Sequence, residues 1–315
     1  MVTDILGQIS RVMRQCKFRF RTVSISHLLE VQEAVENLIR QGLINEQLYK
    51  NWHFYLSTNN NLPEAETIII VAMPQPITRL IFEWQGNTFS AEIAPNYIFE
   101  EDESRVEENL NAVLSQYGYS IVKAHLALKT LAVRSGLAEY GRNNISYISE
   151  FGSFYRLIAF YTDYPCEDDN WGDAKVMKIC ENCSLCLENC PTGSISSDRF
   201  LIRAEKCLGT LNEREPDFPY WAQLQPDWIN AFIGCMSCQS ICPANKSFVS
   251  NILDGDAFSE EETYEILNKT PIVDLSEETR RKIEKFGIGK YLLLASNLSA
   301  LIEKQILAKQ KKSGL

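Results

Sequence analysis

Two runs of cysteine restrict the fold of this 315-residue chain more than any other feature, because they hold eight of its ten cysteines. The first run reads CENCSLCLENCP, ends in Pro191 and contains Cys180, Cys183, Cys186 and Cys190. The second run closes with CMSCQSICP and Pro243, and with a leading cysteine displaced upstream it comprises Cys207, Cys235, Cys238 and Cys242. Such spacing lets several thiolates converge from one short loop, which favours metal binding.

The spacing C-x2-C-x2-C-x3-C-P is that of bacterial ferredoxins with two [4Fe-4S] clusters. In that pattern three cysteines of one run bind one cluster, and the cysteine before proline binds the other. The first cluster is therefore predicted on Cys180, Cys183, Cys186 and Cys242. The second is predicted on Cys190, Cys207, Cys235 and Cys238.

Two alternatives explain the cysteines less well. Disulfides need an oxidising compartment, and the first twenty residues lack the apolar core and cleavage site of a secretion signal. A zinc site needs two CxxC pairs around one tetrahedral ion, which leaves the triple run and both Cys-Pro endings unexplained. Cys16 and Cys166 fall outside the pattern and are expected to be small buried side chains or inert thiols.

Composition places the chain among ordinary globular proteins. Hydrophobic residues make up 45% of it, enough for a substantial core in two or three domains. The longest apolar stretches, such as residues 67–73, are too short to cross a bilayer, so we expect a cytoplasmic protein without a membrane partner. The net charge of −10 argues against a nucleic-acid partner.

Local patterns predict mixed secondary structure before the cysteines. The β-branched run at 67–74 indicates a strand buried on both faces, and residues 80–94 alternate like a hairpin around Gly86. Ser104 and Glu107 form a candidate capping box that would open a helix ending near residue 116. A second helix is predicted over 122–135.

We therefore expect an α+β protein in three parts. Residues 1–172 would form a mixed α/β sheet domain, which includes a further buried strand at 156–164. Residues 173–250 would form a ferredoxin-like domain with two clusters, and residues 251–315 a helical C-terminal segment.

A second motif makes the prediction more specific. The stretch 126–163 contains an R-x-G-L-x-x-x-G-[KR]-N loop followed by a Gly-Ser pair before a strand, and residues 62–74 read LPEAETIIIVAMP. Together with the CPTG after the first cysteine run, these features resemble epoxyqueuosine reductases. That family is related more remotely to reductive dehalogenases, and the similarity covers residues 60–250.

The resemblance implies a nitroreductase-like sheet domain that binds cobalamin and receives electrons from two [4Fe-4S] clusters. The loop residues that would bind the cofactor are Arg134, Gly136, Leu137, Gly141, Arg142 and Asn143. Glycines allow close approach of the backbone to a bulky ligand, and Arg and Asn supply donors. The competing interpretation is that the glycines only end a helix and turn the chain, with Arg142 on the surface.

The chain departs from this family at the proton donor. Where epoxyqueuosine reductases carry Y-A-R-G-R-D-Y-H, residues 97–104 read YIFEEDES, so only Tyr97 and Asp102 match. Either side chain could donate a proton in a dry pocket. However, Asp102 would also favour the start of a helix without any catalytic role, and Tyr97 could simply pack.

The leading hypothesis is therefore an oxidoreductase that passes electrons through two clusters to cobalamin and reduces a small or unknown substrate other than tRNA. An external donor, such as a ferredoxin or flavodoxin, would supply the electrons. The alternative is an electron-transfer or activator protein that reduces a partner protein and has no substrate site of its own. A third possibility is that the sheet domain holds a different cofactor, such as a flavin.

Overall fold

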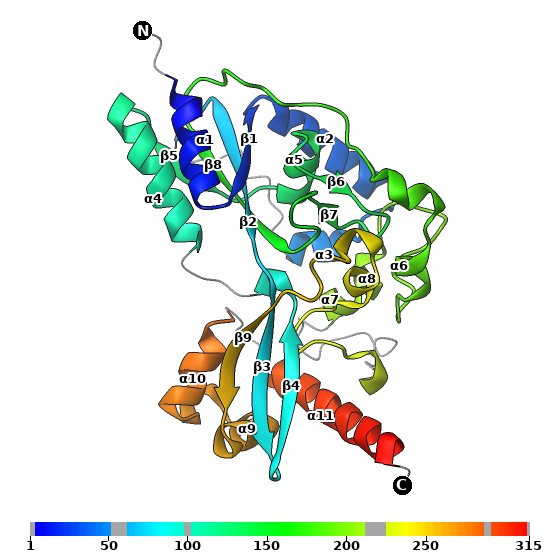
Figure 1. Ribbon diagram of the computed structural model, residues 1–315. Coiled ribbons are helices and arrows are strands. Elements are labelled where there is room, and N and C mark those ends of the chain that lie inside the picture. The colour runs from blue at the N-terminus through cyan, green and yellow to red at the C-terminus, as the bar shows by residue number, and fades with distance from the viewer. Residues whose placement is uncertain (1–3, 52–61, 98–101, 212–224, 287–290, 314–315) are drawn as a thin grey trace. The chain divides into compact units, whose positions relative to one another are not determined.

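The computed structural model describes residues 4–51, 62–97, 102–211, 225–286 and 291–313, which form two compact units (Figure 1). The sheet unit comprises Met1–Gln75, Glu100–Ser184 and Ser197–Arg203. The hairpin unit comprises Pro76–Phe99, Leu185–Ser196 and Ala204–Leu315. The first cysteine run contributes residues to both units, whereas the second run lies wholly within the hairpin unit.

A four-stranded antiparallel sheet forms the centre of the sheet unit, in the order β1-β2-β8-β5. Its strands are β1 (Arg19–Ser24), β2 (Thr67–Pro74), β8 (Tyr155–Thr162) and β5 (Ile121–Ala124). Ile70 of β2 lies opposite Arg21 on one side and Ala159 on the other. The buried strands predicted at 67–74 and 156–164 are therefore confirmed.

Helices cover both faces of this sheet (Figure 1). Side chains of β2 alternate between the faces: Ile68 and Ile70 pack with α2 (His27–Arg40) and α5 (Leu128–Arg134). Ile69 and Val71 pack on the opposite face with α1 (Ile5–Gln15) and α4 (Asp102–Leu114). Each fully buried isoleucine contributes about 1.5–3 kcal/mol, so both helical layers are held by the apolar run of β2. A further helix of this unit, α3 (Glu46–Asn51), precedes β2.

Two predicted helices of the sheet unit differ from the structure. Helix α4 begins at Asp102, so Ser104 lies inside its first turn and the predicted capping box does not form. The helix expected at 122–135 is instead β5 followed by the short α5, because Ile121 to Ala124 pair with the end of β8. This pairing to a strand distant in the sequence overrides the local helical pattern.

The hairpin unit contains the predicted β-hairpin, β3 (Ile77–Trp84) and β4 (Asn87–Ile93). Its two turn residues, Gln85 and Gly86, both have positive φ, as a tight two-residue hairpin turn requires. A third strand, β9 (Ile252–Phe258), pairs parallel to β3. The segment 251–315 therefore begins with a strand, which corrects the expectation that it is wholly helical.

Three helices complete the core of the hairpin unit: α9 (Glu260–Leu267), α10 (Glu277–Glu284) and α11 (Tyr291–Ser313). Phe82 and Phe258 stack with ring centroids 4.7 Å apart, and Phe232 packs against Phe82 at 5.4 Å. Because Phe232 lies three residues before Cys235, the approach to the second cysteine run is part of this core.

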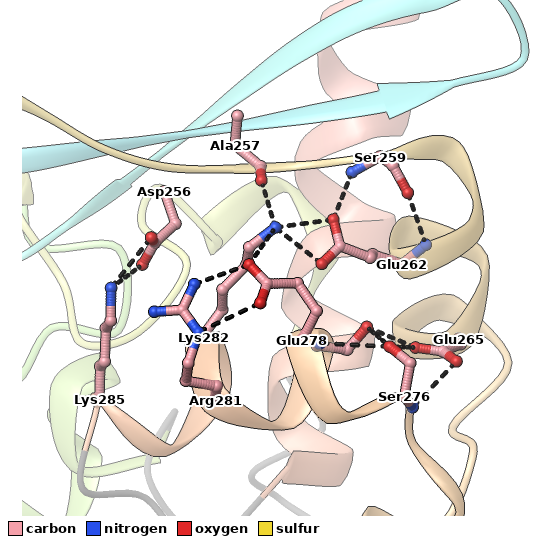
Figure 2. A network of polar contacts seen from close by, with 11 residues as sticks. Asp256, Ala257, Ser259, Glu262, Glu265, Ser276, Glu278, Arg281, Lys282 and Lys285 are labelled. Carbon is pink, nitrogen blue, oxygen red and sulfur yellow. Dashed lines mark hydrogen bonds and ion pairs between the residues drawn. The ribbon is translucent and has the colours of Figure 1, made fainter.

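A polar network ties α9 and α10 to β9 (Figure 2). The ammonium of Lys282 lies 2.7 Å from the nearer carboxylate oxygen of Glu262 and donates to the Ala257 carbonyl at 2.8 Å. Both side chains are only 11% exposed. Glu262 also accepts from the Ser259 backbone N–H and so completes the capping box of α9. The buried charges are therefore paired and hydrogen-bonded, as burial of charge requires.

Candidate functional site

Three predicted ligands of the second cluster lie close together within the hairpin unit. Burial raises the pKa of the Cys207 thiol, and the nearby thiols of Cys235 and Cys190 raise this pKa further. Backbone N–H groups of Gly209 and Thr210, in the short helix α7 (Leu208–Leu211), act in the opposite direction. Three segments of the chain thus place partly exposed thiols within electrostatic range of one another, with N–H donors beside Cys207.

The second loop, residues 235–238, is fixed by its attachment to the core. The Phe232 N–H donates to the Glu92 carbonyl of β4 at 2.7 Å, and Asn297 of α11 donates to the Phe232 carbonyl at 3.0 Å. Gly234 has φ +76°, and a Cβ there would lie 2.4 Å from the ring of Tyr97. The loop therefore requires glycine directly before Cys235, both for its backbone conformation and for space.

Asn230 forms hydrogen bonds to three residues of the second loop. Its side-chain amide donates to the Cys235 Sγ at 3.4 Å and to the Ser237 Oγ at 2.8 Å. Its carbonyl oxygen accepts from the Met236 N–H at 2.8 Å. Asn230 was not predicted as a site residue from the sequence. Its position close before a cysteine loop could have indicated the role, because asparagine side chains often hydrogen-bond to backbone groups nearby.

The other cysteines of the runs lie on short helices or in loops. Cys186 lies on α6 (Leu185–Glu188) and Cys238 on α8 (Ser237–Ser240), and these helices pack together in the hairpin unit. Cys242 belongs to the same unit, whereas Cys180 and Cys183 belong to the sheet unit. The grouping of Cys180, Cys183, Cys186 and Cys242 around the first cluster therefore stays a prediction.

The first loop, residues 180–183, is positioned by strand pairing within the sheet unit. Tyr140 ends the two-residue strand β6 (Glu139–Tyr140), which pairs with β7 (Ser146–Tyr147). Its N–H donates to the Lys175 carbonyl at 2.8 Å, and its carbonyl accepts from the Met177 N–H at 2.8 Å. The chain leading into Cys180 is thereby added to β6 as a parallel neighbour.

Arg142, two residues beyond β6, binds the first loop directly. Its guanidinium donates to the Cys180 carbonyl at 2.6 Å and to the Cys183 carbonyl at 3.1 Å. Its backbone N–H points at the Cys180 Sγ, 3.4 Å away. A residue predicted to contact cobalamin therefore has its donors on the cysteine loop.

The turn around Arg142 is closely packed. Asn144 has φ +58°, and its N–H donates to the Gly141 carbonyl at 2.9 Å. The buried amide of Asn143 donates to the Tyr147 hydroxyl at 2.8 Å. A Cβ at Gly141 would lie 2.6 Å from both Asn143 and Tyr147, so glycine is required there for space.

Arg134, at the end of α5, binds residues of α2 and of the segment 171–172. Its guanidinium donates to the Glu30 carboxylate at 2.6 Å and to the Gly172 carbonyl, and it lies 4.4 Å from the Trp171 ring centroid. The hydrogen bond from Arg134, followed by that from the Trp171 indole, holds the pKa of Glu30 below its usual value. Arg134 thus fastens the 171–172 segment to α2.

Gly136 and Leu137 follow the end of α5. Gly136 has φ +69° and donates its N–H to the Val133 carbonyl at 3.0 Å, which ends the helix. Leu137 is buried in the core beneath the sheet. The interpretation in which the glycine ends a helix therefore describes Gly136 well, and the side chain of Leu137 is used in packing.

The contacts of these residues are suited to iron–sulfur clusters, but they do not favour cobalamin. For iron–sulfur clusters the donor set is suitable, because thiols converge and N–H donors point at the sulfurs of Cys180 and Cys235. For cobalamin, the polar groups of Arg134, Arg142 and Asn143 are bonded within the sheet unit itself. The predicted role of these side chains in binding cobalamin finds no support in their contacts.

The two candidate proton donors belong to different units. Tyr97 is half-buried, and its ring covers Gly234 beside the second loop. Asp102 begins α4, but its side chain lies outside the described residues. Their catalytic roles stay predictions.

None of the ten cysteines is paired in a disulfide. Within the described ranges, no group of three His, Cys, Asp or Glu side chains could hold a single metal ion. The four thiolates of a [4Fe-4S] cluster bind four different irons, so they do not need to meet at one ion. No helix among the described residues is long and apolar enough to cross a bilayer.

Comparison with known proteins bears on both cysteine runs. Residues 179–245 match the model of a family described as a 4Fe-4S double cluster binding domain. An epoxyqueuosine reductase from Bacillus subtilis is 29% identical over 121 residues, 38% of this chain and 30% of that protein. One from Escherichia coli is 33% identical over 119 residues, 38% of this chain and 30% of that protein. The matched segments thus span about a third of these curated relatives.

Solved structures extend the likeness of fold to most of the chain. An epoxyqueuosine reductase from Streptococcus thermophilus aligns with a TM-score of 0.66 and 17% identity, over 98% of this chain and 85% of that chain. A structure of epoxyqueuosine reductase with a modified tRNA stem loop aligns with a TM-score of 0.59 and 18% identity, over 95% of this chain and 82% of that chain. The chain is therefore similar to epoxyqueuosine reductases, in sequence over 38% of its length and in fold over nearly its whole length.

Proposed function

We propose that this protein is an iron–sulfur oxidoreductase whose two cysteine runs hold two [4Fe-4S] clusters. The observation that carries the proposal is the spacing of the eight cysteines in two runs, with the thiols of Cys190 and Cys235 lying near that of Cys207. The match of residues 179–245 to a double cluster binding domain supports the same assignment. When bound, such clusters accept and release single electrons.

The residues of this chain would prepare the sites for that chemistry. Cysteine binds iron as thiolate, so cluster assembly must remove the proton that burial favours on Cys207. The N–H groups of Gly209 and Thr210 favour the thiolate, and Asn230 donates to the sulfur of Cys235. The ring of Tyr97 lies against the backbone at Gly234, directly before the second loop.

The proposal also concerns the substrate and a candidate second cofactor, cobalamin. The resemblance to epoxyqueuosine reductases implies cobalamin, but because Arg134, Arg142 and Asn143 are bonded within the sheet unit, the proposal assigns cobalamin to none of these side chains. A related structure was solved with a tRNA stem loop, so an epoxyqueuosine-bearing tRNA is the first substrate to test. Our sequence-based expectation of a substrate other than tRNA rests on the acidic charge and the altered proton-donor motif.

The experiment is anaerobic reconstitution with iron, sulfide and hydroxocobalamin, followed by gel filtration, an absorption spectrum and an assay on the modified tRNA stem loop. Bound iron, co-eluting corrinoid and loss of the epoxide would support a reductase like the related proteins. Bound iron without corrinoid or turnover would favour the second candidate, an electron-transfer or activator protein. That candidate is favoured by the engagement of Arg134 and Arg142 within the fold.

A further inference from the structure

Arg142 lies in the loop that resembles the cofactor-binding motif, yet three of its nitrogens donate to the first cysteine loop. Two guanidinium nitrogens bind the carbonyls of Cys180 and Cys183 at 2.6 and 3.1 Å. The backbone N–H lies 3.4 Å from the Cys180 Sγ. The two ends of a CxxC turn, and the sulfur of its first cysteine, are thus bound by one residue 38 positions upstream.

We propose that Arg142 is a positioning residue for the cluster on Cys180 and Cys183, and that its positive charge raises the reduction potential of this cluster. The inference rests on the proposed function, because it concerns one of the two proposed clusters. It differs from the role implied by resemblance, in which Arg142 would contact cobalamin.

The charge argument follows from what reduction does. A one-electron reduction adds negative charge to the cluster and its thiolates, and a cation held nearby stabilises that added charge. Hydrogen bonds to the sulfurs act in the same direction, and both are among the properties by which proteins set cluster potentials. The guanidinium cannot lose its charge at accessible pH, so its contribution is constant.

The position of Arg142 is fixed by its surroundings. The pairing of β6 with residues 175–177 sets the distance between the arginine and the cysteine loop. The packed turn at Gly141 and Asn143 leaves no space for a side chain at Gly141 and holds the backbone N–H of Arg142 toward Cys180. The fold of the sheet unit therefore holds the donors of Arg142 on the first cysteine loop.

The test is a redox titration with dithionite, followed by electron paramagnetic resonance, on the reconstituted full chain. Arg142→Gln keeps one amide donor and removes the charge, whereas Arg142→Lys keeps the charge and loses the planar fork. Arg134→Gln is the matched control, because that arginine lies in the same motif but binds Glu30 and Gly172.

We expect wild-type protein to show two one-electron steps and about eight irons. Arg142→Gln should move one step to more negative potential and leave the other in place. Arg142→Lys should keep both steps close to their wild-type potentials, because it keeps the charge. Arg134→Gln should move neither step. Loss of about four irons from Arg142→Gln, with the second step intact, would also support the positioning role.

Two results would overturn the inference while leaving the proposed function intact. One is a full set of irons with both steps unmoved in Arg142→Gln. The other is loss of corrinoid binding in this variant with both steps unmoved. Should Arg142→Gln fail to fold, Arg142→Met decides, because it also removes the charge: one step moved to more negative potential supports the inference, and a full set of irons with two unshifted steps contradicts it. Wild-type protein that binds no iron would instead refute the proposed function itself.

Discussion

The two cysteine loops are held by different means. The first, residues 180–183, is bound by a charged arginine that lies far upstream in the sequence and belongs to the α/β part of the sheet unit. The second, residues 235–238, is bound by the neutral Asn230, five residues before its first cysteine. Two loops of nearly identical sequence pattern thus acquire different electrostatic surroundings, and their clusters should differ in potential.

The loops also depend on different cores. The first loop requires the pairing of β6 with residues 175–177. The second requires the hairpin unit, in which Phe232 packs with Phe82 and bonds to β4. Damage to one core should therefore affect one loop more than the other, which gives a way to examine each separately.

The largest expected effect is loss of one cluster. Cys183→Ala should remove about half of the iron, since each cluster holds four irons. Cys207→Ala should remove the other half, because Cys207 lies with Cys190 and Cys235. Iron analysis and redox titration of each variant check this. If both variants lose the same redox step, the proposed division of ligands is wrong.

The next largest effect concerns the core of the hairpin unit. Lys282→Met leaves Glu262 without its ammonium partner in a buried position, which should lower the free energy of unfolding by about 3 kcal/mol. Arg281→Met is the matched control on the same helix, because its pair with Glu278 is exposed to solvent and should contribute little to stability.

Urea unfolding followed by circular dichroism measures both variants. At intermediate urea, Lys282→Met should lose the redox step assigned to Cys235 before the step that responds to Arg142. Equal loss of both steps would contradict the separate dependence of the loops on their cores.

The smallest effect is a change in the potential of the second cluster. Asn230→Ala removes the N–H donor to Cys235, and a hydrogen bond of about 1 kcal/mol corresponds to a negative shift of about 40 mV for one electron. Asn230→Asp places a carboxylate beside this sulfur and should shift the potential further in the same direction. Redox titration shows whether the Asn230 variants and Arg142→Gln move different redox steps. If they move the same step, the two residues do not act on separate clusters, and the comparison of the two loops is wrong.

Part of this structure could be predicted from the sequence. The strand at 67–74 and the hairpin around Gly86 were predicted because their apolar pattern and turn residues act locally. Pairing between distant segments could not be predicted in this way: β9 beside β3, and β5 beside β8, arise from contacts that no local pattern contains.

The site shows the same limit. The cysteine spacing predicted the cluster ligands, and residues 179–245 match a double cluster binding domain. The motif around Arg142 drew attention to the right residue, but its role depends on residues 175–177 lying beside β6. The motif identified Arg142 as a residue of interest, but tertiary packing determines which groups its side chain contacts.

The most direct test of the account is the number of irons and redox steps in wild-type protein after anaerobic reconstitution. Iron and sulfide analysis should give about eight of each, and titration should resolve two one-electron steps at different potentials. About four irons with a single step, or tightly bound zinc with no redox step, would contradict the claim that this chain holds two clusters in different surroundings.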